Sequence, residues 1–167
     1  MLSTFTHRPV TREDLPAVSA LHDRVFGPGR FVRTAYRIRE ASSDEGCSRY
    51  CRIGLKDGRI VAALRMTEIA IGGAKGALLL GPLTVDPSVT GQGFGRTLVA
   101  DALEAARSQG VQLVLLVGDE PYYSRFGFKP VPLGQITLPG PVNPVRLLAA
   151  ELTDAPLARY KGLVSGV

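Results

Sequence analysis

Apolar and polar residues change their spacing several times along the chain, and each spacing predicts an element. Residues 4–10 alternate as in a strand, whereas residues 12–26 carry apolar positions at helical spacing with Thr11 as a candidate N-cap. Residues 31–41 predict a second helix, and the serine-rich stretch 42–48 predicts a loop. The N-terminal part is therefore expected to contain one strand and two helices.

The next region predicts a hairpin followed by a buried strand. Residues 50–55 and 59–71 read as strands, and the Asp57-Gly58 pair between them is a strong signal for a type I′ turn. Residues 77–85, ALLLGPLTV, form an apolar run that contains Pro82. A central strand holds proline only where pairing is broken, so we expect a bulge or a separation of strands there.

A helical period follows this strand. Its apolar positions are Phe94, Leu98, Val99, Ala102, Leu103 and Ala106. Gly110 is expected to cap the helix, which spans residues 94–109, and the apolar run 111–117 predicts a second buried strand. A strand, a helix and a strand in this order imply a parallel pair joined by a right-handed crossover.

The remaining residues predict shorter elements. Residues 121–126 read as a helical turn and residues 126–131, FGFKPV, as a strand. Four of the twelve prolines fall in the segment 132–144, which we expect to be mostly loop. Residues 145–152, VRLLAAEL, fit either a strand or a helical turn. The predicted fold class is α/β, with a mixed central sheet, a discontinuity near Pro82 and flanking helices.

Composition narrows the class of protein. A length of 167 residues with 45% hydrophobic and 21% charged residues fits one globular domain over residues 1–167. No apolar stretch approaches the ~20 residues of a membrane span, and the N-terminus lacks the pattern of a signal peptide. We therefore expect a cytoplasmic protein without membrane association. Two cysteines and two histidines predict no metal site.

The net charge of +5 favours an anionic partner. No lysine or arginine run and no basic–aromatic repeat accompanies this charge, which disfavours nucleic acid as the partner. A polyphosphate ligand suits the same charge.

Gly91, Gly93 and Gly95 alternate in TGQGFGR, between a buried strand and a helix start. Glycine lets the backbone approach a ligand closely, and a helix start supplies free N–H groups and a positive dipole end. The pattern indicates a site for a pyrophosphate, with a ligand-free turn as the alternative. Arg96 stands where a dinucleotide fingerprint needs its third glycine, and no Gly-Lys-Ser/Thr follows as in a Walker loop.

Two segments carry a resemblance to a known family. Residues 85–99, VDPSVTGQGFGRTLV, resemble the acyl-CoA-binding motif Q/R-x-x-G-x-G/A of the GNAT superfamily of N-acetyltransferases. Thr90 stands at the Q/R position, a departure expected to lower CoA affinity without abolishing binding. The segment GDEPYYSRFGFKPV is similar to the family's downstream segment, with Tyr123 four residues before Gly127-Phe128. Its GDxxYYxRFGF form resembles a bacterial subgroup of predicted acetyltransferases.

The resemblance implies a GNAT-like sheet splayed between its fourth and fifth strands, where the pantetheine arm of acetyl-CoA enters. The residues implied to bind acetyl-CoA are Leu83, Thr84, Val85, Thr90, Gly91, Gln92, Gly93, Phe94, Gly95, Arg96, Thr97 and Tyr122. Tyr123 matches the family's general acid, which protonates the CoA thiolate. Arg96 fits either a phosphate contact or a solvated helix surface, and Arg125 is a second source of charge.

The implied activity is acetyl transfer from acetyl-CoA to a primary amine by direct attack in a ternary complex. Asp119, Glu120 and Glu68 are candidate bases, and the sequence does not choose among them. A non-catalytic acyl-CoA sensor is the alternative, and a nucleic-acid-binding domain ranks third. The acceptor is a small-molecule or peptide amine, and the segment 132–144 is a candidate wall of its pocket or a homodimer contact.

Overall fold

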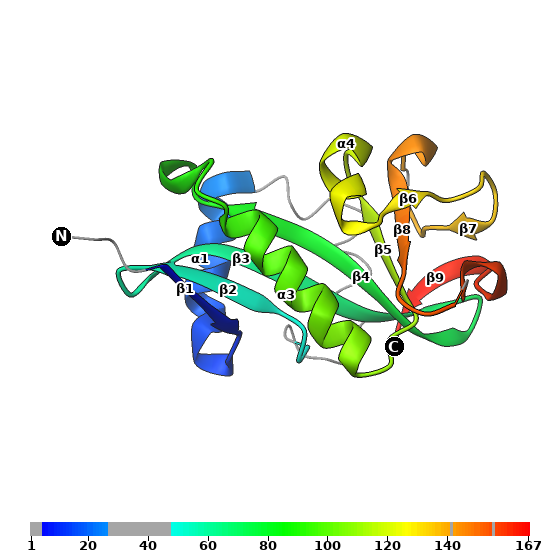
Figure 1. The fold of residues 1–167 in the computed structure, drawn as a ribbon, viewed down its shortest axis with the longest axis horizontal. Coiled ribbons are helices and arrows are strands. Elements are labelled where there is room, and N and C mark those ends of the chain that lie inside the picture. The colour runs from blue at the N-terminus through cyan, green and yellow to red at the C-terminus, as the bar shows by residue number, and fades with distance from the viewer. Residues whose placement is uncertain (1–4, 27–47, 141, 155) are drawn as a thin grey trace.

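The computed structural model describes residues 5–26, 48–140, 142–154 and 156–167, which form a mixed sheet with helices on its faces (Figure 1). The strand order is β1-β2-β3-β4-β5-β8-β6, and β9 joins β3 and β7 at one end. The strands are β1 (Phe5–Pro9), β2 (Arg52–Lys56), β3 (Arg59–Ile71), β4 (Ala74–Val85), β5 (Leu113–Val117), β6 (Lys129–Pro130), β7 (Ile136–Thr137), β8 (Leu147–Glu151) and β9 (Gly162–Gly166). The helices are α1 (Leu15–Phe26), α3 (Phe94–Ser108) and the single turn α4 (Glu120–Tyr123).

The first helix begins later than the sequence predicts. Arg12–Asp14 forms a 3-10 turn, and α1 starts at Leu15. The Asp14 carboxylate closes this turn, because its Oδ2 atom accepts the Thr11 N–H and the Thr11 hydroxyl, both at 2.8 Å. Arg8 adds two more hydrogen bonds to the same carboxylate, at 2.7 and 2.9 Å. The predicted helix 31–41 lies outside the described residues, as does most of the loop 42–48.

The predicted hairpin is confirmed. Asp57 and Gly58, which join β2 to β3, have φ values of 52° and 80°, and a type I′ turn requires a positive φ at both positions. A second turn at Gly72-Gly73 joins β3 to β4, which therefore begins at Ala74 rather than at residue 77.

Strand β4 carries the predicted discontinuity at Pro82. Leu83 pairs with Leu64 of β3 and Leu80 pairs with Met66, so β4 has one extra residue in this interval, a β-bulge at Gly81-Pro82. The parallel pairing of β4 with β5 covers only residues 77–79 against 113–115. Beyond Leu79 the two strands separate. The bulge and the separation of strands, each expected as a reason for a proline here, are therefore both present.

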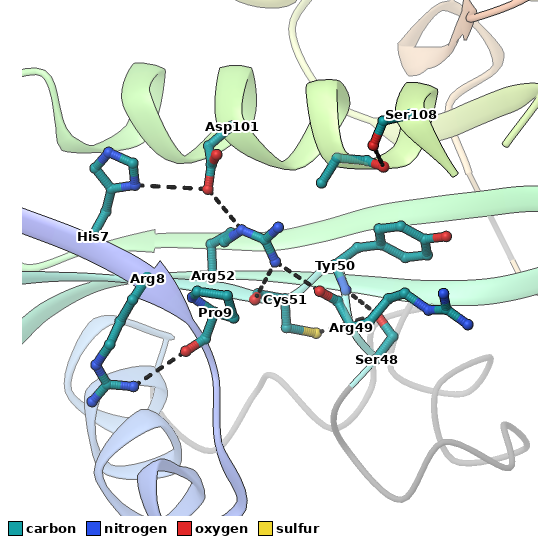
Figure 2. Close-up of polar contacts among 11 residues, drawn as sticks. His7, Arg8, Pro9, Ser48, Arg49, Tyr50, Cys51, Arg52, Asp101 and Ser108 are labelled. Carbon is teal, nitrogen blue, oxygen red and sulfur yellow. Dashed lines mark hydrogen bonds and ion pairs between the residues drawn. The ribbon is translucent and has the colours of Figure 1, made fainter. Parts of the chain in front are cut away.

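Helix α3 covers one face of the sheet and α1 the other (Figure 1). The residues predicted for the buried side of α3 are all buried, namely Phe94, Leu98, Val99, Ala102, Leu103 and Ala106. Figure 2 shows a polar tie between this helix and the sheet. Arg52 is buried on β2 and donates from Nε to Asp101 Oδ2 of α3 at 2.7 Å. Its Nη1 atom donates to the Arg49 carbonyl at 2.7 Å.

The C-terminal elements are partly those expected. The predicted strand 126–131 is reduced to the two residues of β6, and the next segment contains the short strand β7. Residues 145–152 are mainly a strand, since β8 pairs antiparallel with β5 over five residues. Strand β9 is not predicted by the sequence pattern. The Cys51 thiol is buried and donates to the Met66 carbonyl at 3.5 Å. None of the described helices is long and apolar enough to cross a bilayer.

The network around Asp14 makes a prediction about stability. The guanidinium of Arg8 and the Thr11 groups hold the pKa of Asp14 below its ordinary value, so this carboxylate stabilises the fold above pH ~4 and loses that effect as the pH falls. Asp14→Asn is expected to lower the free energy of unfolding by about 1–2 kcal/mol at pH 7 and by less at pH 3. Urea unfolding at both pH values measures this, with exposed Glu13→Gln as control. An equal loss at both pH values would contradict the assignment.

Candidate active site

The glycine loop between β4 and α3 leaves a row of backbone N–H groups without partners. Gly91 and Gly93 have φ values of 82° and 88°, a conformation that favours glycine, and no atom beyond the adjacent residues lies within 4 Å of a Cβ built at either position. Within the residues that the structure describes, five amides in this loop and the first turn of α3 donate no hydrogen bond, those of Gly91, Gly93, Phe94, Gly95 and Arg96. Together with the helix dipole, they form a cradle for an anion.

The edge of β4 next to this loop is also open. Asp86 N donates to Val61 O at 2.8 Å, which fixes the antiparallel register between β3 and the end of β4. In that register Thr84 turns its backbone groups toward β3, whereas Leu83 and Val85 turn theirs toward the opposite edge. Strand β5 has separated from β4 at this point. Leu83 and Val85 therefore offer backbone donors and acceptors to a ligand that lies along β4.

Thr84 differs from its two neighbours. Its side chain is fully buried, and its hydroxyl has no hydrogen-bond partner among the described residues. Of the three predicted β4 residues, Thr84 is the one whose backbone groups face β3, and its side chain lies on the opposite face of the sheet from those of Leu83 and Val85.

Gly95 allows the start of α3 to lie against the end of β4. A Cβ at Gly95 would lie 3.4 Å from Leu83 Cδ2 and 3.6 Å from Val85 Cγ2. The same position is 3.1 Å from the Tyr122 hydroxyl, so Tyr122 reaches from α4 to the first turn of α3. Arg125 stacks on the Tyr122 ring, with its guanidinium carbon 5.0 Å from the ring centroid. The structure thus brings the glycine loop, the open strand edge and Tyr122 together.

Tyr123 faces a different environment from Tyr122. The two rings meet edge-on at 4.9 Å, and Tyr123 packs against Phe128 and the main apolar core. Burial raises the pKa of Tyr123 to about 12, with smaller contributions from Tyr122 and Asp119 that are opposed by Arg146. Its hydroxyl makes no hydrogen bond within the described part of the chain. The phenol is therefore neutral at physiological pH and available as a donor.

The three candidate bases differ in their contacts and in their relation to Tyr123. Asp119 precedes α4, its carbonyl accepts the Tyr123 N–H at 3.1 Å, and its carboxylate is 3.5 Å from Arg146. Glu120 is exposed at the start of α4, and Glu68 is exposed on β3 opposite Leu78. Asp119 is the candidate that contributes to the electrostatic environment of Tyr123.

The remaining predicted ligand residues lie on the loop and the start of α3. The side chains of Thr90, Gln92 and Arg96 are exposed there, and Thr97 N donates to the Gly93 carbonyl at 3.0 Å. Phe94 instead points into the core, so that only its backbone N–H belongs to the cradle.

Three contacts that sequence spacing does not reveal join the loop and the start of α3 to other elements. Arg24 of α1 pairs with Asp86 at 3.2 Å, and Lys56 Nζ donates to Gln92 Oε1 at 3.0 Å. Phe5 of β1 packs on the Phe94 ring with a centroid distance of 4.0 Å. Each contact joins residues at least 36 positions apart, and no local motif marks them.

This geometry agrees with the comparisons with known proteins. The family of the acetyltransferase (GNAT) domain matches residues 6–131. The chain belongs to the GNAT acetyltransferase family. The match spans both motifs on which the resemblance rests, and the parallel β4–β5 pair with flanking helices is the arrangement of solved GNAT structures.

Relatives of known sequence and structure support the same family. The uncharacterized N-acetyltransferase YhbS of Escherichia coli (strain K12) is 27% identical over 121 residues, which cover 70% of this chain and 68% of that protein. The structure of Escherichia coli YhbS in complex with CoA shares the fold with a TM-score of 0.83, over 100% of this chain and 92% of that one. A GNAT acetyltransferase of Brucella melitensis in complex with acetyl-CoA is 27% identical, with a TM-score of 0.62 over 89% of this chain and 96% of that one.

Gly118 gives a testable account of how Tyr123 is positioned. A Cβ at Gly118 would lie 2.6 Å from Tyr123 Cε2, so Gly118→Ala is expected to displace the ring and cost about 1–3 kcal/mol of stability. The same substitution in a Tyr123→Ala background should cost less, because the ring is absent. Urea unfolding of the four proteins in this cycle measures the coupling. Equal costs in both backgrounds would exclude the ring as the obstacle.

Proposed function

We propose that this GNAT protein transfers an acetyl group from acetyl-CoA to a primary amine. The observation that carries the proposal is the anion cradle of five free amides next to an unpaired strand edge and a neutral tyrosine. A pyrophosphate suits the cradle, and a pantetheine arm suits the edge at Leu83 and Val85. The CoA and acetyl-CoA bound to the two similar proteins support the same ligand for this chain.

The reaction follows from these roles. The amine nitrogen attacks the thioester carbonyl carbon, the C–N bond forms, and the C–S bond breaks with its electron pair on sulfur. The Tyr123 hydroxyl donates a hydrogen bond to the sulfur as negative charge develops. The proton that the amine loses passes to a base and then through water to the thiolate, which leaves as the CoA thiol. A phenol with a pKa of about 12 is a weak acid, so its main contribution is a hydrogen bond to the developing thiolate.

We propose the amine acceptor only by its chemical class, a small-molecule or peptide primary amine. Asp119 is the candidate base, because it adjoins Tyr123 in the same turn. Its ion pair with Arg146 leaves one carboxylate face to a water molecule or to the amine itself. The non-catalytic sensor of acyl-CoA remains the second candidate, favoured by the shorter side chain at Thr90.

Binding and turnover test the proposal separately. Acetyl-CoA at 100 times its dissociation constant should stabilise the folded chain by about 2.7 kcal/mol and raise its Tm by several degrees. Release of CoA thiol with a panel of primary amines then separates an enzyme from a sensor. A Tm unchanged by millimolar acetyl-CoA would overturn both the enzyme and the sensor. A shift in Tm without release of CoA thiol in the presence of any amine would favour the sensor.

The raised pKa of Tyr123 predicts the pH dependence of the reaction. Because the neutral phenol persists up to about pH 12, kcat should show no tyrosine-dependent fall between pH 8 and pH 10. Tyr123→Phe should lower kcat about 10²-fold or more across this range, with little change in the dissociation constant of acetyl-CoA. Tyr160→Phe, remote from α4, serves as control. An alkaline fall near pH 9 that disappears in Tyr123→Phe would contradict this assignment.

A further inference from the structure

Lys56 places a positive charge against the glycine loop from outside the loop's own sequence. It is the last residue of β2, and its Nζ atom donates to Gln92 Oε1 at 3.0 Å. Gln92 is a neutral partner, and Lys56 forms no ion pair with any carboxylate that the structure describes. The amine is solvent-accessible at this contact. A lysine held in this way keeps its charge available to an anion bound at the loop.

Other charges near the loop add to this effect. Arg59 is the cross-strand partner of Lys56, and directly opposite residues of a hairpin share one face of the sheet. Arg96 is exposed in the first turn of α3. Neither arginine forms an ion pair with a described residue. The carboxylate of Asp86, which begins the loop, is already occupied by Arg24 and the Ser88 N–H, at 3.2 and 2.9 Å.

The loop itself lacks a long polar side chain at Thr90, where the GNAT motif has glutamine or arginine. We propose that Lys56 takes over that role and binds a phosphate of CoA, contributed by the β2–β3 hairpin instead of by the loop. The inference rests on the proposed function. Exchange of the Gln92 amide oxygen for a phosphate oxygen converts a neutral acceptor into a charged one, which strengthens the hydrogen bond of the ammonium group.

The hairpin geometry makes this role possible. Asp57 and Gly58 form a tight turn with positive φ values, which pairs Lys56 with Arg59 at the end of the hairpin. The Lys56 stem then spans the remaining distance to Gln92, 36 residues later in the chain. A lysine one residue away along β2 would face the opposite side of the sheet. The contact therefore depends on the register of the hairpin.

Calorimetric titration of CoA and of dephospho-CoA into the full chain tests the proposal. Lys56→Gln removes the charge, and Lys56→Arg retains it. Lys75→Gln, an exposed lysine at the far end of β4, is the matched control. We expect Lys56→Gln to raise the dissociation constant of CoA about three- to tenfold at low salt, Lys56→Arg to change it less than about twofold, and Lys75→Gln to leave it unchanged. The Lys56→Gln effect should shrink at 0.5 M salt.

Comparison of CoA with dephospho-CoA, which lacks the 3′-phosphate, identifies the phosphate that Lys56 binds. A loss of affinity for both ligands assigns Lys56 to the pyrophosphate, and a loss for CoA alone assigns it to the 3′-phosphate. The proposal is overturned if Lys56→Gln, folded by its thermal transition, binds CoA as tightly as Lys75→Gln does. If the unmodified chain binds no CoA, the proposed function itself has failed, and this inference fails with it.

Discussion

The separation of β4 and β5 after Leu79 is the constraint on which the site depends. Parallel strands that are paired along their whole length have no free backbone groups between them. Here each strand is stabilised on its other edge, β4 by β3 and β5 by five residues of β8. The two strands can therefore part without leaving either one alone. The bulge at Gly81-Pro82 lies where the strands part, and beyond it the backbone groups of Leu83 and Val85 face the gap.

The start of α3 is fixed by packing rather than by the glycine loop itself. Phe94 is buried in the core and lies against Gly54, where a Cβ would approach its ring to 2.6 Å. Gly95 closes the distance to β4 in the same way. Since the core holds both residues, the loop amides are oriented before any ligand arrives. Preorganisation of this kind removes part of the entropic cost of binding.

The sequence predicted the elements that depend on local spacing, among them the hairpin at Asp57-Gly58, the helix from Phe94 and the interruption at Pro82. It placed the start of α1 too early, because the side chain of Asp14 closes a 3-10 turn that hydrophobic spacing does not report. The shortening of the predicted strand 126–131 to the two residues of β6 depends on tertiary pairing, as does the unpredicted strand β9. The same applies to the contact of Lys56 with Gln92, which exists only through the fold.

Adjacent tyrosines on α4 lie in different environments because a helical turn points them in different directions. Tyr122 reaches the first turn of α3 and is held by Arg125, whereas Tyr123 packs on Gly118 and Phe128. Packing fixes the position of the Tyr123 hydroxyl and at the same time raises its pKa, which reduces its strength as an acid. The same packing that fixes the Tyr123 hydroxyl therefore makes it a weaker acid. A group that must donate to a sulfur anion, which is itself a weak base, gains more from a fixed neutral hydroxyl than from a more acidic but mobile one.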